Sequence, residues 1–166
     1  MAKRNQGQQP QQGLTLYHYT STVHLQQILA DKEIKLTCSN LLRPQNPRIV
    51  NGNAVSDTDS YKPVVWFSSV LDFKAAAFCG LAGSVVDKTE AAIMVVIRPP
   101  MIAHKWAEWA TANDIETEWF NRLKATAPAW KTFYITEFPV KFDENTRIIF
   151  RPDIAAELNP DAEGSE

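Results

Sequence analysis

Hydrophobic and polar positions alternate where the apolar pattern begins and then switch to a helical period. Residues 14 to 19 alternate as a strand does, which places Leu16 and His18 on one face. Hydroxyl side chains at residues 20 to 22 can cap a following helix, because a Ser or Thr oxygen accepts from the free N–H groups of a first turn. The i, i+3, i+4 spacing of apolar residues predicts that this helix runs to about Lys32 and buries one stripe.

Further strands and helices follow without regular strand–helix alternation. Strands are expected at Glu33–Thr37, Pro63–Ser69, Ala91–Arg98, Lys131–Phe138 and Thr146–Phe150. Helices are expected at Leu71–Cys79, at 103 to 112 and at 114 to 126. Many strands with few helices, outside a βαβ order, favour an α+β fold over a doubly wound sheet.

Two tails and one long loop interrupt this pattern. Residues 1 to 13 are rich in Gln, and residues 153 to 166 are acidic; both segments are expected to be disordered, which leaves one domain over 14 to 152. Residues 38 to 62 hold Asn, Pro, Ser and Asp without periodicity. A loop of that length in a compact domain is more often functional than idle.

Composition narrows the class of protein. The chain has 166 residues, 45% of them hydrophobic, which suits one domain with a sizeable core. A net charge of -2 argues against a protein that binds nucleic acid mainly through phosphates. Two cysteines, Cys38 and Cys79, and no secretory signal indicate reduced thiols and a cytoplasmic location. No apolar run is long enough to span a membrane.

His18 is the first residue that suggests chemistry. It lies on the apolar face of a strand that ends in a hydroxyl-rich turn, beside the start of a helix, where anionic ligands bind favourably. An imidazole there can hydrogen-bond a ribose or phosphate oxygen without titrating. The structural alternative is a hydrogen-bonded core histidine.

Glu137 is the second candidate. Strand alternation puts it on the face of Phe133 and Ile135, and an inward carboxylate is costly unless it is paired or functional. It could stabilise an oxocarbenium-like centre, as carboxylates do in glycoside cleavage. The alternative is a charge at the end of a strand that reaches water just before Pro139.

The segment Trp66-Phe67-Ser68 is the third candidate, because small hydroxyls follow aromatic residues where a strand ends beside a helix. Trp66 is also a natural core residue, and Ser68 could cap the helix, contact a ligand or do both. The Trp residues between 106 and 130 fit either a core or a partner surface. No Cys/His cluster has metal-ligand spacing, so no metal site is expected.

Together these residues suggest a family. The opening Leu16-Tyr17-His18-Tyr19-Thr20-Ser21, followed by Leu25, Ile28-Leu29 and Ile34-Lys35-Leu36, resembles the start of the DarT-type DNA ADP-ribosyltransferases and related small bacterial and phage proteins. More distantly it resembles the RNA 2′-phosphotransferases. The resemblance implies an ADP-ribosyltransferase-like fold with mixed and antiparallel sheets and a single domain.

The resemblance also implies a site that takes NAD as substrate. In it His18 holds a ribose, Glu137 is catalytic, and the pocket is formed by Tyr17, Tyr19, Thr20, Ser21, Trp66, Phe67 and Ser68. A lysine and a glutamate stand at 32 and 33, where the family usually has a glycine after the first helix.

The implied function is an NAD-dependent ADP-ribosyltransferase or NAD glycohydrolase, in a toxin or in phage–host conflict. The acceptor, whether DNA, RNA, protein or water, and the oligomeric state stay open. One alternative is a catalytically inactive module of the same fold that binds a nucleotide or a partner protein. Another is an RNA 2′-phosphotransferase, although its expected arginines are scattered here.

Overall fold

The computed structural model describes residues 13–37, 48–50, 53–55, 63–77, 86–113 and 117–159. Its strands are β1 (Leu14–Thr20), β2 (Glu33–Ile34), β3 (Arg48–Val50), β4 (Asn53–Val55), β5 (Val65–Ser68), β6 (Ala91–Ile97), β7 (His104–Lys105), β8 (Phe133–Thr136), β9 (Val140–Lys141) and β10 (Arg147–Phe150). Its helices are α1 (Thr22–Asp31), α2 (Phe73–Ala76), α3 (Trp106–Ala112), α4 (Thr117–Thr126) and α5 (Pro152–Leu158), with a short 3₁₀ turn at Trp130–Thr132. The α+β class predicted from the sequence is confirmed, since a mostly antiparallel sheet is combined with a few helices.

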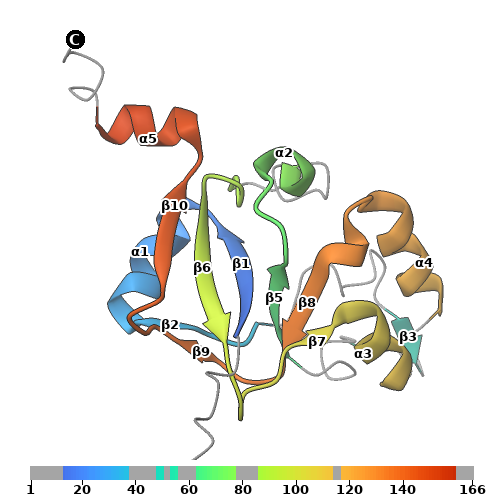
Figure 1. Ribbon diagram of the computed structural model, residues 1–166. Coiled ribbons are helices and arrows are strands. Elements are labelled where there is room, and N and C mark those ends of the chain that lie inside the picture. Colours follow the sequence, from blue (N-terminus) through green and yellow to red (C-terminus); the bar gives the residue numbers. More distant parts are fainter. Residues whose placement is uncertain are drawn as a thin grey trace, which may run out of the picture.

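The main sheet has six strands in the order β10-β6-β1-β5-β8-β7, and Figure 1 shows β6 and β1 side by side within it. All seven residues of β1 pair antiparallel with β6, and Thr20 at the end of β1 lies opposite Ala91 at the start of β6. The chain that leads into β6 therefore lies beside the end of β1. The near-continuous apolar sequence of β6 suits this central position, since five of its seven residues are buried and the other two, Met94 and Val96, are half-buried.

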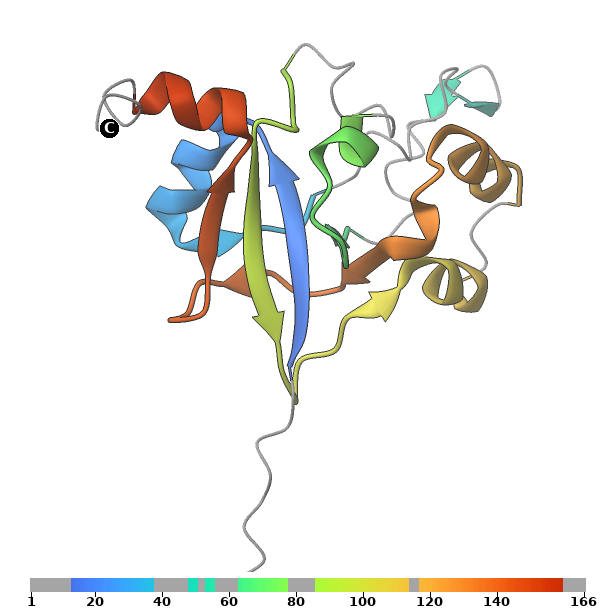
Figure 2. The ribbon, with the colours of Figure 1, turned by 45° about the horizontal axis from the view of Figure 1, so that its top comes forward.

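β1 and β5 are joined by a single residue pair, Tyr17 with Ser68. On its other side β5 pairs with β8 over four residues. The sheet thus consists of two well-paired parts, β10-β6-β1 and β5-β8-β7, which separate on either side of the Tyr17–Ser68 pair. Figure 2 shows β5 standing apart from β1, while β1 and β6 stay in contact.

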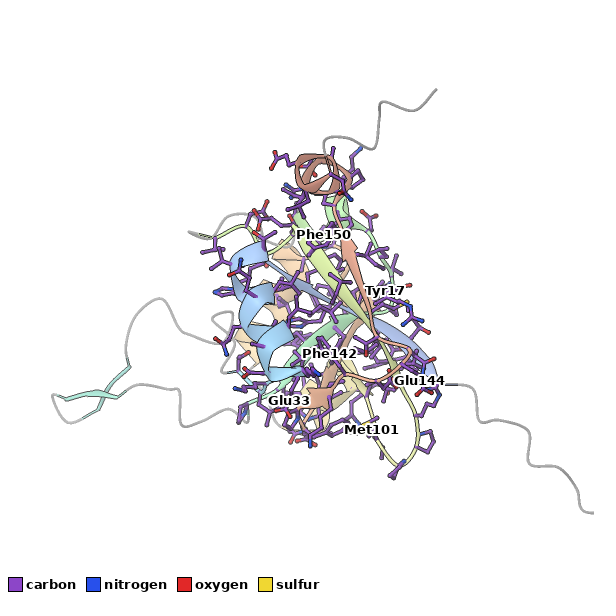
Figure 3. All side chains as sticks on the ribbon, turned by 90° about the vertical axis from the view of Figure 1, so that its left-hand side faces the viewer. Tyr17, Glu33, Met101, Phe142, Glu144 and Phe150 are labelled. Atoms are coloured by element: carbon purple, nitrogen blue, oxygen red, sulfur yellow. The ribbon has the colours of Figure 1, made fainter. Side chains whose placement is uncertain are left out.

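Helix α1 begins as the sequence predicts. The Ser21 hydroxyl accepts from the His24 N–H at 3.1 Å, and the Glu90 carboxylate accepts from the Thr22 N–H at 2.7 Å. Both bonds satisfy N–H groups that a helix start leaves free. Leu25 is buried from this helix against the sheet, on the face opposite to the one where Figure 3 shows Tyr17.

Two clusters of buried side chains hold the two parts of the sheet. The first lies between α1 and the strands and includes Leu16 and Phe67. The second joins α3 and α4 to the other part of the sheet and includes the fully buried Trp106 and Ile135. The segment of β5 contributes to both, since Phe67 belongs to the first cluster and Trp66 packs against the second. Alternate side chains of a strand point to opposite faces, so β5 separates the two clusters.

Several expected elements differ from those observed. The helix expected from residue 103 begins only at Trp106, and His104 lies in β7, opposite Ile135 of β8. The expected loop 38 to 62 contains the hairpin β3–β4. The rest of that predicted loop lies outside the described residues, as do Cys38 and Cys79. A two-residue strand or a short hairpin leaves too little periodicity to be recognised in a sequence.

The acidic end of the chain is a further correction. The tail expected from residue 153 is helical as far as Leu158, in α5. Pro152 at the first helical position and Asp153 in the first turn are typical of a helix start, so the signal was present. Within the described residues no helix combines the length and apolar character needed to cross a membrane.

Lys32 ends α1 in a left-handed conformation, with φ 52° and ψ 34°, and its N–H bonds the Ile28 carbonyl. A side chain in this conformation costs free energy that glycine does not pay. We expect Lys32→Gly to raise the free energy of unfolding by about 0.5–1 kcal/mol, as measured by urea denaturation. Lys32→Ala is the matched control, and a gain of the same size from alanine would contradict the conformational explanation.

Candidate functional site

A cavity of about 290 Å³ opens where β1 and β5 separate. It is bounded by β1, β5, α2, the end of α4 and the start of β8. Its lining residues are Tyr17, His18, Tyr19, Trp66, Phe67, Ser68, Val70, Asp72, Ala75, Ala76, Lys88, Leu123, Ala129, Thr132 and Phe133. The lining is mostly apolar and aromatic with a few polar groups, which is typical of small-molecule sites.

His18 spans the gap between the two strands. Its Nδ1 lies 2.9 Å from the Trp66 carbonyl oxygen, and its ring meets Phe67 edge-on with centroids 5.9 Å apart. A carbonyl only accepts, so Nδ1 carries the proton and Nε2 keeps its lone pair while the ring is neutral. Burial lowers the pKa of His18 below its usual 6.5; the Trp66 bond opposes this, and the charge of Lys88 lowers it further. At neutral pH His18 therefore presents a hydrogen-bond acceptor.

Tyr19 makes a second bridge across the same gap. Its hydroxyl donates to the Val70 carbonyl at 3.1 Å and accepts from the Asp72 N–H at 2.7 Å. Its ring meets Phe73 of α2 edge-on at 5.7 Å. Tyr19 thus fixes the segment that connects β5 to α2, and this segment forms one wall of the cavity.

The Ser68 hydroxyl has defined bonding directions. Thr132 donates its single hydroxyl proton to the Ala129 carbonyl at 2.8 Å. The contact of 3.1 Å between Ser68 Oγ and Thr132 Oγ1 is therefore donated by Ser68, whose oxygen also accepts from the Val70 N–H at 3.1 Å. The hydroxyl of Ser68 is engaged in holding the chain and is not poised as a nucleophile.

Aromatic side chains form the wall on the β5 side. Trp66 stacks on Trp106 with centroids 5.8 Å apart and meets Phe133 edge-on at 6.1 Å. Trp66 packs on the second core cluster, as a core residue is expected to, and it also lines the cavity. The buried Trp106 and Trp109 are core residues, in keeping with the core interpretation of that segment.

Two oppositely charged side chains complete the lining. Asp72 caps α2, since its Oδ1 accepts from the Ala75 N–H at 2.9 Å. Lys88 lies in the segment 86–90 that leads into β6, next to the end of β1. The cavity therefore has one carboxylate and one ammonium group among the described lining residues.

Most of the predicted site residues meet in this cavity. His18 and its neighbours Tyr17 and Tyr19 face the segment Trp66–Ser68 across the gap. Thr20 and Ser21 do not line it; both are buried, and Ser21 caps α1.

Glu137 does not lie at the cavity either. The expected inward orientation was wrong: β8 ends at Thr136, and Glu137 is exposed. The alternation fails because the chain bends there, where the Thr136 hydroxyl donates to the Phe138 carbonyl at 2.9 Å. At about 3.3 Å per residue, Glu137 lies about 13 Å along the chain from Phe133, where β8 meets the cavity.

Lys88, Asp72 and Thr132 line the cavity and were missed in the sequence analysis. Lys88 and Asp72 lie in connections between elements, and Thr132 ends the 3₁₀ turn that precedes β8. The position of Lys88 follows from the pairing of β1 with β6, because this pairing brings the residues before Ala91 to the end of β1. That pairing joins residues far apart in the chain and cannot be predicted from a single sequence.

Comparison with protein-family models, with curated proteins and with solved structures finds no match to this chain. Among the residues that the structure describes, no group of three or more His, Cys, Asp or Glu side chains could hold a metal ion.

His18 predicts how stability depends on pH. Because its pKa is lower in the folded protein than the usual 6.5, the unfolded chain takes up a proton first as the pH falls. The contribution of neutral His18 to the free energy of unfolding is therefore complete above about pH 6.5. It is lost as the pH falls towards the pKa of His18 in the folded protein. We expect wild type to lose more stability than His18→Gln between about pH 7.5 and pH 5, as measured by urea unfolding.

The carboxylates Asp87, Asp143 and Asp153, whose pKa values are lowered below 3.8, titrate at lower pH and do not interfere in this window. Equal losses in wild type and variant would show that His18 is not held neutral by burial.

Proposed function

We propose that this chain is an NAD-binding protein of ADP-ribosyltransferase type and that the cavity between β1 and β5 holds part of NAD. One observation carries the proposal: two predicted site segments, 48 residues apart at His18 and Trp66, meet at one cavity. The resemblance of the opening sequence to the DarT-type enzymes supplies the ligand class. It also supplies the finer fold assignment, an ADP-ribosyltransferase-like arrangement of the two parts of the sheet.

The polar groups of the cavity suit a ribose. The neutral His18 offers Nε2 as an acceptor for a ribose hydroxyl, while its other nitrogen is fixed by the Trp66 carbonyl. A fixed tautomer holds the ring in one orientation, so little reorganisation accompanies binding. This role needs no change of charge on the imidazole, which agrees with a lowered pKa.

The size of the cavity limits what it holds. Its volume of about 290 Å³ lies at the lower end of the range of roughly 300–1,000 Å³ for small-molecule sites. A heteroaromatic ring with its ribose fits this scale better than a whole dinucleotide. Aromatic side chains such as Tyr17 and Trp66 line the same space and favour a planar ring by stacking. We therefore assign the nicotinamide riboside half to the cavity.

Catalysis would proceed through the carboxylate on the cavity wall. In NAD cleavage the bond between ribose C1′ and the nicotinamide nitrogen breaks, nicotinamide leaves with the electron pair, and a cationic ribosyl centre forms. A nearby carboxylate stabilises that centre. Asp72 is the carboxylate among the described lining residues, whereas Glu137 follows the end of β8 and does not line the cavity. The acceptor would be a protein, a nucleic acid or water.

A catalytically inactive nucleotide-binding module is the second candidate. One oxygen of Asp72 already caps α2, which constrains how the carboxylate can turn towards a ligand. An RNA 2′-phosphotransferase is less well supported, since no arginine lies among the described lining residues.

NAD binding and NAD cleavage can be tested on one set of variants. By calorimetry we expect His18→Ala to weaken NAD binding by about tenfold, the equivalent of one hydrogen bond. His18→Gln, which keeps a donor and an acceptor, should lose less. His24→Ala is the matched control, because His24 is an exposed histidine on α1 away from the cavity.

A nicotinamide-release assay then separates the two candidates. We expect Asp72→Asn, which keeps an oxygen for the α2 cap, to abolish release without loss of NAD binding, and Glu137→Gln to leave release unchanged. NAD binding without any release by wild type would favour the inactive module. Absence of NAD binding would overturn the proposal.

A further inference from the structure

We propose that Lys88 binds a phosphate group of the nucleotide next to the ribose held by His18, an inference that rests on the proposed NAD site. Lys88 is the one cationic side chain among the described residues that line the cavity.

The segment that carries Lys88 is fixed on both sides. Arg151 donates to Asp87 Oδ2 at 2.8 Å and to the Thr89 hydroxyl at 2.8 Å. The Thr89 N–H and hydroxyl in turn donate to Asp87 Oδ1, at 2.8 and 2.6 Å. Burial opposes ionisation of Asp87, but the bonds from Thr89 and Arg151 outweigh it and lower the pKa of that carboxyl. The ion pair of Asp87 with Arg151 is therefore charged at neutral pH and holds the segment around Lys88 in one conformation.

Glu90, which follows Thr89, is held by helix α1. The Glu90 carboxylate accepts from the N–H and the hydroxyl of Thr22, at 2.7 and 2.8 Å. The Glu90 carbonyl accepts from the Arg151 N–H at 2.9 Å. In the sequence Asp87-Lys88-Thr89-Glu90, the other three side chains are anchored to Arg151, to Thr22 of α1 or to one another, and Lys88 alone lines the cavity.

This arrangement suits an anionic ligand. The ion pairs found among the described residues do not include Lys88, so its ammonium group remains for a ligand there. An ammonium group is a compact charge with three donors and binds phosphate as a point charge. A backbone held by neighbouring bonds lowers the ordering cost of that contact. Since His18 and Lys88 line the same cavity, a nucleotide with its ribose at His18 can place its 5′ phosphate at Lys88.

Two ligands that differ by one phosphate test the inference. Nicotinamide riboside and nicotinamide mononucleotide should be titrated calorimetrically into wild type and Lys88→Gln. We expect the variant to bind the mononucleotide about tenfold more weakly, as for one charge-assisted hydrogen bond, and the riboside unchanged. Lys88→Arg, which keeps the charge, should recover most of the loss. Lys105→Gln removes an exposed lysine outside the cavity and controls for net charge.

The outcomes separate this inference from the proposed function. If wild type binds the riboside and Lys88→Gln weakens both ligands equally or neither, Lys88 does not contact the phosphate, and the NAD site stands without it. If wild type binds neither ligand, both proposals are overturned. A thermal unfolding curve of Lys88→Gln that matches wild type excludes loss of folding as the cause of weaker binding.

Discussion

The separation of β1 from β5 is the constraint on which the rest of the structure depends. The two strands share one residue pair, Tyr17 with Ser68, so backbone groups beyond it lack the partners that a continuous ladder would give. Side chains supply those partners: His18 donates to the Trp66 carbonyl, and the Tyr19 hydroxyl bonds the Val70 carbonyl and the Asp72 N–H. His18 and Tyr19 therefore hold the gap in place, and the cavity lies in that gap.

The two cores explain why the gap persists. α1 covers the part of the sheet built on β1 and β6, and α3 and α4 cover the part built on β5 and β8. Each part buries its own apolar side chains, and β5 contributes to both clusters, so closing the gap would require one cluster to be repacked. Tightly packed cores resist such a shift, which leaves the small cavity between them as a stable feature of the fold.

Elements with a strong local signal could be predicted from the sequence. Ser21 as the cap of α1 and the apolar run of β6 both appear where expected, because capping chemistry and periodicity act over a few residues. The strands β7 and β9 are too short to show a period, and α5 was missed despite Pro152 at its start. At the site, the meeting of His18 with the segment Trp66–Ser68 was predicted through the resemblance. The position of Lys88 depends on the pairing of β1 with β6, and that of Glu137 on the residue at which β8 ends; both are set by tertiary structure.

The central claim is that the gap between β1 and β5 is a nucleotide site and not only a structural feature. The most direct measurement is a titration of the ¹⁵N-labelled protein with NAD, followed by amide resonances. The account predicts saturable shifts concentrated at residues 17–19, 66–72 and 88, with β2 and β9 unaffected, because these two strands pair with each other outside the main sheet and do not line the cavity. Shifts centred elsewhere, or none at saturating NAD, would contradict it.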